Sequence, residues 1–252
     1  MQPMDIRYAK VASPVALIYL GSPAVAPLSQ GLGELQECQA ALTAQGWRVI
    51  VLHNRGGAST LERALAEHNP RVLHFIGHAD AKIGSSQART LGLTDAAGEL
   101  SLCSAKTLAD LIAAHCLDLV FLNGCQSAGL ARTVCAQGTC CIGWETDAHD
   151  LAASIFAAAV YAQLPPPVSI ASLRNAFESG LRRVVDTLGQ RRGGVANSHA
   201  AATRLPGGGV RLQFELAMPT QGIHKHNQRD QEKDPRAFAL AGVPVLLLPQ
   251  GL

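Results

Sequence analysis

Two apolar segments of the sequence each end in a side chain that could take part in covalent catalysis. Residues 72–77 lead into His78, and residues 117–124 lead into Cys125, which lies 47 positions after the histidine. If both segments are neighbouring strands of a parallel sheet, their carboxyl ends meet at one edge, where such sheets carry their chemistry. A thiol beside an imidazole suffices for nucleophilic catalysis, because the imidazole raises the thiolate fraction and carries the proton. The pair predicts a cysteine peptidase.

Hydrophobic periodicity predicts the framework that would bring these strand ends together. Short apolar runs that end at Gly or Pro predict buried strands, and apolar residues at helical spacing predict the helices between them. Because the two alternate over the first two thirds of the chain, we expect a mostly parallel sheet covered on both faces. The predicted strands span residues 15–20, 47–53, 71–76, 117–123 and 139–144, and the predicted helices span residues 34–45, 104–115, 126–136, 147–164 and 169–188, with one more helix capped by Ser59.

Smaller features are predicted elsewhere in the chain. Residues 91–94 and 99–102 flank a turn and predict a hairpin. Residues 189–209 are polar and rich in glycine, which predicts a mobile loop. Residues 210–216 alternate as a strand, and residues 237–248 form a last apolar segment. A chain of 252 residues forms one large domain or two small ones.

Composition narrows the classes of function. Apolar residues make up 48% of the chain and charged residues 16%, which indicates a well-packed α/β protein and not a disordered one. A net charge of +2 provides no field for nucleic acid or an anionic membrane, so we expect direct binding to neither. No apolar run reaches the ~18 residues of a membrane span, and we expect no signal peptide. We therefore expect a cytoplasmic protein.

The seven cysteines do not form a disulfide framework or a zinc motif. Most are expected to act as small apolar core residues in a reducing compartment. No Cys-x-x-Cys pair occurs, and the group Cys135, Cys140 and Cys141 has no histidine at ligand spacing. Gly31 and Gly33 lack the third glycine of a dinucleotide site, and no phosphate loop or serine-nucleophile elbow is present. We expect neither metal nor cofactor.

The residues around the two reactive side chains resemble a known family. Residues 74–79 are similar to the histidine motif of the CHAT family, the caspase-like peptidases of bacteria, and residues 122–128 are similar to its cysteine motif. The resemblance implies a caspase-hemoglobinase fold, a three-layer α/β/α sandwich with a mostly parallel central sheet. Further landmarks follow in the family's order, so that the similarity runs from about residue 15 to residue 242: residues 142–144, Asp150, Tyr161 and residues 236–242.

The resemblance also implies catalytic roles. Cys125 attacks the scissile carbonyl and His78 protonates the leaving amine. Backbone N–H groups of Cys125 and Ala79 hold the oxyanion, and donors of this kind contribute ~2.7–4 kcal/mol each. Ala79 stands where many relatives carry Gly or Ser, which narrows the backbone angles of that turn. We expect His74 on the opposite face of the strand from His78, either as a hydrogen-bonded core histidine or as a histidine that supports the site from behind.

The substrate pocket leaves more than one interpretation open. Several caspase-like families keep an Asp two residues before the nucleophile to bind Arg or Lys, and here that position is Asn123. Glu145, Asp147 and Asp150 follow the fifth strand and could line the pocket instead. Asp147 and Asp150 are alternatively a helix N-cap and its first-turn partner; we favour the cap for Asp147 and leave Asp150 open. A preference for a basic P1 residue is one hypothesis.

The resemblance divides a single domain of residues 1–252 into two parts and a linker. The larger part, about 1–188, carries His78 and Cys125, and the smaller part spans about 210–252. The linker, about 189–209, contains Arg191, Arg192 and Arg204, which suit activation by the protein itself or by an upstream protease. A solvated loop without cleavage is the alternative.

These features together predict a cysteine endopeptidase that cleaves protein substrates through a His78–Cys125 dyad. A proteolytic cut or a partner such as a sensor protein would control it. Family members occur in programmed cell death and in antiphage or CRISPR-linked defence, and the resemblance implies such a setting. Two alternatives remain: a catalytically silent caspase-like interaction module, and a cysteine hydrolase or acyltransferase that acts on a small amide.

Overall fold

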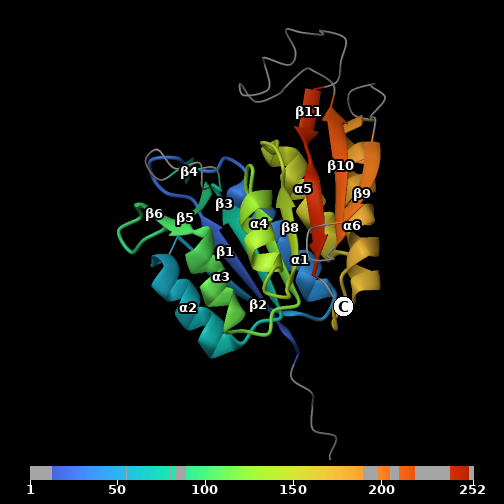
Figure 1. Cartoon of the computed structure of the whole chain (residues 1–252). Coiled ribbons are helices and arrows are strands. Elements are labelled where there is room, and N and C mark those ends of the chain that lie inside the picture. Colours follow the sequence, from blue (N-terminus) through green and yellow to red (C-terminus); the bar gives the residue numbers. More distant parts are fainter. Residues whose placement is uncertain are drawn as a thin grey trace, which may run out of the picture.

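A central sheet between two layers of helices organises the chain (Figure 1). The computed structural model describes residues 13–54, 56–79, 81–82, 89–189, 198–204, 210–218 and 239–249. The strand order is β11-β10-β12-β8-β7-β3-β1-β2, and β9 pairs with β10. This arrangement confirms the predicted α/β/α sandwich with a mostly parallel central sheet.

Five parallel strands form the half of the sheet that carries His78 and Cys125. β1 pairs with β2 and β3, β3 pairs with β7, and β7 pairs with β8. All residues of β1, β3, β7 and β8 are buried, as expected for parallel strands with helices on both faces. Their bounds are Val15–Gly21 for β1, Arg48–His53 for β2, Val72–Gly77 for β3, Leu119–Asn123 for β7 and Cys140–Trp144 for β8.

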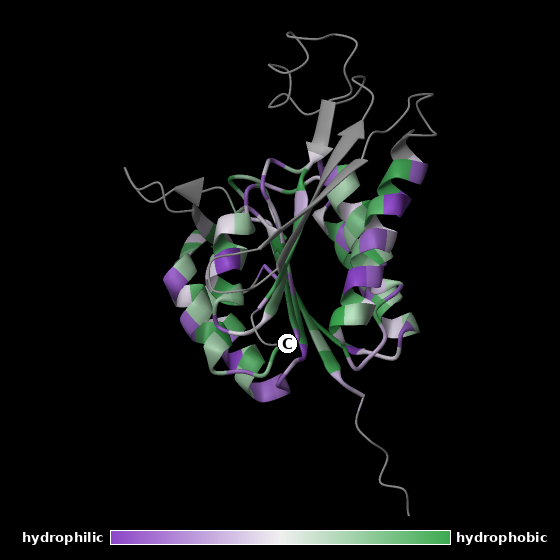
Figure 2. Ribbon diagram, turned by 45° about the vertical axis from the view of Figure 1, so that its right-hand side comes forward, coloured by the Kyte–Doolittle hydropathy of each residue, from purple (hydrophilic) through white to green (hydrophobic). Residues whose placement is uncertain are grey.

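The helices cover the sheet in two layers with separate cores. α1 (Gly31–Ala44), α5 (Asp150–Tyr161) and α6 (Ile170–Val184) pack on one face. On the other face lie α2 (Gly57–His68), α3 (Ala105–Ala113) and α4 (Ala128–Cys135). Figure 2 shows the apolar strands between these layers and the hydrophilic residues on the outer sides of the helices. A short π-helix, η1 (Val185–Gly189), continues α6.

The remaining strands are antiparallel. β12 (Pro244–Leu248) pairs with β8, and β10 (Val210–Met218) pairs with β12, β11 (Ala239–Gly242) and β9 (Ser198–Arg204). β9 corrects the prediction of a loop over residues 189–209. Its composition is poor in strand-forming residues, and the ladder with β10 imposes the extended form. Arg204 ends this strand, whereas Arg191 and Arg192 lie outside the described residues.

A small second sheet and the start of α2 complete the description. β5 (Arg89–Thr94) and β6 (Leu100–Ser104) form the predicted hairpin, and β4 (Ala81–Lys82) pairs with β5. The predicted Ser59 cap is wrong, because α2 begins at Gly57 and its N-cap is Gly56. Both glycines have positive φ angles, 68° and 60°, which glycine adopts without a steric cost, so the helix starts earlier.

Candidate active site

His78 and Cys125 occupy equivalent positions at the carboxyl ends of two adjacent strands. The last registered pair between β3 and β7 is Ile76 with Asn123, and each reactive residue follows two positions later. Both residues line one cavity of about 540 Å³. The sheet therefore brings the predicted dyad residues together at one site.

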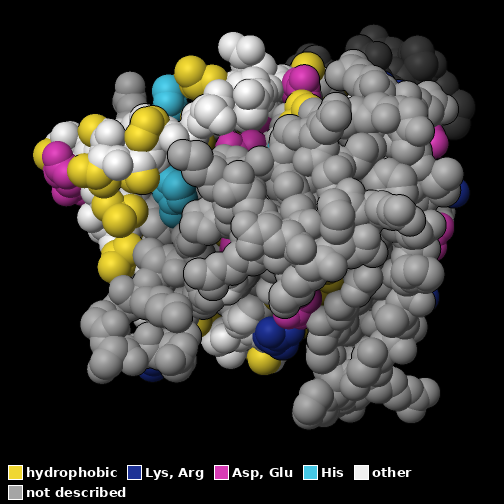
Figure 3. Space-filling model, turned by 90° about the horizontal axis from the view of Figure 1, so that it is seen from above, with side chains coloured by type: hydrophobic (Ala, Val, Ile, Leu, Met, Phe, Trp, Pro, Cys, Tyr) yellow, Lys and Arg dark blue, Asp and Glu magenta, His cyan; other side chains and the backbone are white. Residues whose placement is uncertain are grey.

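The cavity is built from loops that follow four of the parallel strands. Figure 3 views the molecule from the side on which these strands end, where Asp, Glu and His side chains are visible among the described residues. A cavity at the carboxyl edge of a parallel sheet is the usual location of a binding site in this fold class. The lining comes from residues 27–31, Glu34, residues 76–78, residues 123–126, residues 147–150 and Ala153.

A backbone carbonyl orients the His78 ring. Its Nε2 lies 2.8 Å from the carbonyl oxygen of Ala26, in the segment after β1. A carbonyl can only accept, so Nε2 carries the proton and Nδ1 is the basic nitrogen of the neutral ring. The same hydrogen bond remains when the ring is protonated. Sequence reasoning missed Ala26, because a backbone acceptor leaves no signature in the side chains.

The backbone around Ala148 holds the Cys125 thiol. The Ala148 N–H donates to Sγ at 3.5 Å, and Sγ lies 3.9 Å from the Ala148 carbonyl oxygen. Ala148 directly precedes His149, the N-cap of α5. A thiolate at this position therefore has a backbone donor and the positive end of a helix dipole nearby. Ala148, like Ala26, contributes through its backbone.

Burial distinguishes the thiols of the core from the thiol of Cys125. It raises the pKa of Cys103 and Cys140 to about 11, so both stay protonated at neutral pH. Cys125 is half-buried at the cavity. The candidate nucleophile is thus distinguished by access as well as by its place at a strand end.

The turn after Cys125 is tied to the loop before α5. Gln126 has a φ of 54°, a left-handed conformation that costs a non-glycine residue about 1–2 kcal/mol. Its N–H donates to the Thr146 carbonyl at 2.9 Å, and its side-chain Nε2 donates to Asp147 Oδ1 at 2.7 Å. Thr146 in turn accepts at Oγ1 from the Val243 N–H at 3.1 Å. These bonds connect the nucleophile to the C-terminal strands.

Small residues allow the ends of β3 and β7 to approach closely. A Cβ on Gly124 would collide with the Gly77 carbonyl and lie 2.9 Å from Ala79 Cβ and 3.2 Å from Ala79 N. The backbone of Ala79 therefore packs directly against the residue before Cys125. Ala79 itself is fully buried. Its predicted role as an oxyanion donor stays a prediction.

The predicted pocket residues divide into two groups. Asn123, Asp147 and Asp150 line the cavity, whereas Glu145 does not. The Glu145 carboxylate turns instead toward Arg132 on α4, at 2.7 Å. The predicted cap at Asp147 is wrong as well, because His149 occupies the N-cap position.

Asp147 and Asp150 each have a partner that explains their position. Asp147 accepts from Gln126, which holds it at the cavity and away from the end of α5. Asp150 lies in the first turn of α5 and accepts from Ser29 Oγ at 3.1 Å. The Asp150 carboxylate therefore interacts favourably with the dipole of α5, and it also lines the cavity.

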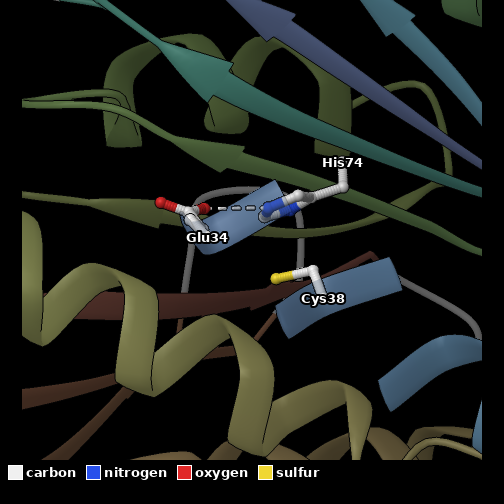
Figure 4. Close-up of side chains that lie close together, drawn as sticks. All are labelled: Glu34, Cys38 and His74. Atoms are coloured by element: carbon white, nitrogen blue, oxygen red, sulfur yellow. Dashed lines mark hydrogen bonds and ion pairs between the residues drawn. The ribbon is translucent and has the colours of Figure 1, made fainter. Parts of the chain in front are cut away.

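A buried polar network lies beneath the cavity. Glu34 Oε1 accepts from His74 Nε2 at 3.0 Å, as Figure 4 shows. The same oxygen accepts from Asn123 Nδ2 at 2.6 Å. Asn123 Oδ1 accepts from Trp144 Nε1 at 2.6 Å. His74 is fully buried and hydrogen-bonded, which confirms it as a core histidine. The expected opposite face is wrong, because positions four apart on a strand face the same side, and Glu34, which binds His74, lines the cavity together with His78. Glu34 was missed, because helical periodicity showed only the apolar neighbours on α1.

Cys38 adds a third ligand-type atom to this network. The ligand atoms of Glu34, Cys38 and His74 all lie within 4.8 Å of one another. Burial, followed by the carboxylates of Glu34 and Glu37, raises the pKa of Cys38 well above its usual value. Zinc is bound by thiolate and normally has four ligands. The described arrangement is that of a hydrogen-bonded Glu–His pair beside a protonated thiol.

A parallel sheet between helices, with His and Cys at adjacent strand ends, defines a caspase-like domain of the class related to cysteine peptidases. The family model of the CHAT domain matches residues 11–185, well over half of the chain. The chain belongs to the CHAT domain family, which confirms the resemblance in its sequence. No curated protein matches it significantly. Within the described residues, no helix combines the length and apolarity needed to cross a membrane.

Proposed function

We propose that this protein is a cysteine endopeptidase that cleaves protein substrates through His78 and Cys125. The observation that carries the proposal is the pair's shared cavity, with the ring held by the Ala26 carbonyl and the sulfur by the Ala148 N–H. Two backbone groups thus orient the acid–base residue and the nucleophile independently of each other. Such positioning is what nucleophilic catalysis requires.

The reaction would proceed through an acyl-enzyme. His78 Nδ1 takes the thiol proton, and the Cys125 thiolate attacks the scissile carbonyl carbon. His78 then returns the proton to the leaving amine as the C–N bond breaks, which leaves a thioester on Cys125. Water, deprotonated by His78, attacks that thioester and releases the acid and the thiol. Backbone N–H groups of Ala79 and Cys125 would hold the oxyanion in both steps, contributing ~2.7–4 kcal/mol each.

Control of this activity belongs to the same proposal. We place it in the cytoplasm, with an upstream protease or a sensor protein as activator and cell death or antiphage defence as its setting. Arg191, Arg192 and Arg204 are the candidate cleavage positions. Intact-mass measurement during the onset of activity tests this part: full activity without a cut in residues 189–209 would exclude linker cleavage and leave a partner as activator.

A covalent peptidyl probe tests the chemistry. An acyloxymethyl ketone peptide should label the protein, and the label should disappear in Cys125→Ala and His78→Ala. Cys116→Ala is the matched control, because Cys116 is an exposed thiol outside the cavity. Labelling together with cleavage of a protein such as denatured casein supports the peptidase. Labelling with turnover of small amides only supports the small-amide hydrolase, and no labelling in any condition supports the silent module.

A further inference from the structure

The described lining of the cavity is acidic. It contains three carboxylates, from Glu34, Asp147 and Asp150, and neither Lys nor Arg. Asp147 and Asp150 are half-exposed, whereas Glu34 is only 5% exposed. A buried carboxylate is far less screened than one at the surface, so Glu34 dominates the field inside the cavity.

One oxygen of Glu34 remains available to a ligand. Oε1 accepts both hydrogen bonds of this carboxylate, from His74 and from Asn123. Oε2 points away from His74 in Figure 4, and it has no hydrogen-bond partner among the described residues. An unpartnered oxygen of a largely buried carboxylate that lines a cavity is an acceptor site for a group from outside the protein.

The neighbours of Glu34 do not cancel its charge. His74 Nε2 donates to Glu34, while His74 Nδ1 is buried and has no hydrogen-bond partner among the described residues. A protonated ring would bury an unsatisfied N–H at that nitrogen, so the geometry favours the neutral ring. Asn123 is a neutral donor. Glu34 therefore carries a buried negative charge that no described side chain pairs.

Asn123 fits this arrangement better than an aspartate would. Trp144 Nε1 donates to Oδ1, which turns the amide NH₂ toward Glu34 at 2.6 Å. A carboxylate at position 123 would face Glu34 at hydrogen-bond distance with the same charge. In this chain the acidic group of the pocket thus comes from α1, and Asn123 positions it.

We propose that Glu34 is the specificity-determining residue of a substrate pocket that selects peptides with Lys or Arg at P1, which rests on the proposed endopeptidase function. The cationic side chain enters beside Cys125 and its charged group binds Glu34 Oε2. Asp147 and Asp150 add attraction nearer the mouth. A cavity of about 540 Å³ has room for an arginine side chain with part of its peptide.

Matched peptides that differ only in P1 charge test the proposal. We expect wild-type protein to cleave a P1 Arg peptide with a kcat/KM on the order of 100-fold above its citrulline analogue, which has nearly the same shape without the charge. Glu34→Gln should lose most of this ratio and retain cleavage of the citrulline peptide. Glu37→Gln is the matched control, because Glu37 lies on the same helix, is exposed and does not line the cavity.

A binding measurement on wild-type protein decides the question even where the variant folds poorly or no peptide is cleaved. Butylguanidine should slow alkylation of Cys125 by iodoacetamide, and butylurea, its neutral analogue of nearly the same shape, should not. Equal protection by both compounds, a wild-type preference for acidic or apolar P1, or an unchanged Arg/citrulline ratio in a folded Glu34→Gln protein would overturn the proposal. Protection by butylguanidine without cleavage of any peptide would contradict the endopeptidase and support the cation-binding pocket.

Discussion

The rim of the cavity and the network beneath it are held in different ways. At the rim, the reactive side chains rest on backbone groups: the Ala26 carbonyl orients His78, and the Ala148 N–H contacts Cys125. Beneath it, Glu34, His74, Asn123 and Trp144 hold one another through their side chains. Substitutions at Ala26 or Ala148 can keep the backbone contact, whereas a substitution in the network removes a partner. The two regions should therefore respond differently to mutation.

The largest expected effect is a loss of activity on substitution of the two reactive residues at the rim. Cys125→Ala and His78→Ala should each lower kcat/KM by at least about 10³-fold, because removal of either residue disables the whole dyad. Both variants should unfold near the wild-type temperature, since neither residue contributes to the main cores. Peptide kinetics and thermal unfolding check this. If a dyad variant failed to fold, the expected difference between the rim, where mutation affects activity, and the network, where it affects stability, would be contradicted.

A change in the network should act first on stability. Asn123→Asp places a carboxylate against Glu34, and we expect a loss of about 3 kcal/mol in the free energy of unfolding at neutral pH. The loss should shrink as pH falls, because the repulsion raises the pKa of the pair and the folded state then binds the additional proton. Urea unfolding at pH 7 and pH 5 measures it. An equal loss at both values would exclude charge repulsion as the cause.

A smaller effect is expected where β3 and β7 meet. Gly124→Ala adds a Cβ against the Gly77 carbonyl and Ala79, and overpacking of this kind costs about 1–3 kcal/mol. Because the shift displaces Cys125, activity should fall by about 10²-fold. Gly129→Ala on α4 is the matched control: its Cβ meets nothing within 4 Å, and the change should stabilise by up to about 1 kcal/mol. Similar behaviour of both variants would contradict the close approach.

The smallest expected effect concerns the core thiols. The pKa of Cys103 and Cys140 is about 11 in the folded protein, above the value of 9.0 for an unperturbed thiol. The unfolded chain loses these protons first as pH rises, so the free energy of unfolding should fall between pH 9 and pH 11. Cys140→Ala should reduce that slope. At neutral pH, mass spectrometry should find alkylation at Cys125 before either core thiol.

Residue patterns predicted the parts of the fold that rest on local burial. Parallel strands covered on both faces read as continuous apolar runs, which is why β3 and β7, and with them His78 and Cys125, could be located. β9 was missed because its pairing with β10, and not its composition, makes it a strand. Glu145 was misplaced because its direction depends on Arg132, which the strand pattern does not locate.

The network was harder to predict than the dyad. Glu34 joins His74 and Asn123 from a position far away in the sequence, and a helical pattern does not reveal which polar residue faces inward. Ala26 and Ala148 act through the main chain, whose hydrogen bonds do not depend on the residue type. Reactive residues at strand ends can thus be predicted from the sequence, whereas the groups that orient them are located only by the structure.

The hydrogen bonds of Thr146 have a consequence for the proposed cleavage of the linker. Thr146 joins Gln126, next to the nucleophile, to Val243 between the last two strands, and Glu145 N–H donates to the Val243 carbonyl at 2.8 Å. β12 pairs with β8 at four registered positions, Pro244 with Trp144 through Leu247 with Cys141, and neither strand lies in the linker. A cut in the linker would therefore leave two fragments that stay assembled. The smaller fragment would retain the hydrogen bonds of Val243 that support the turn after Cys125.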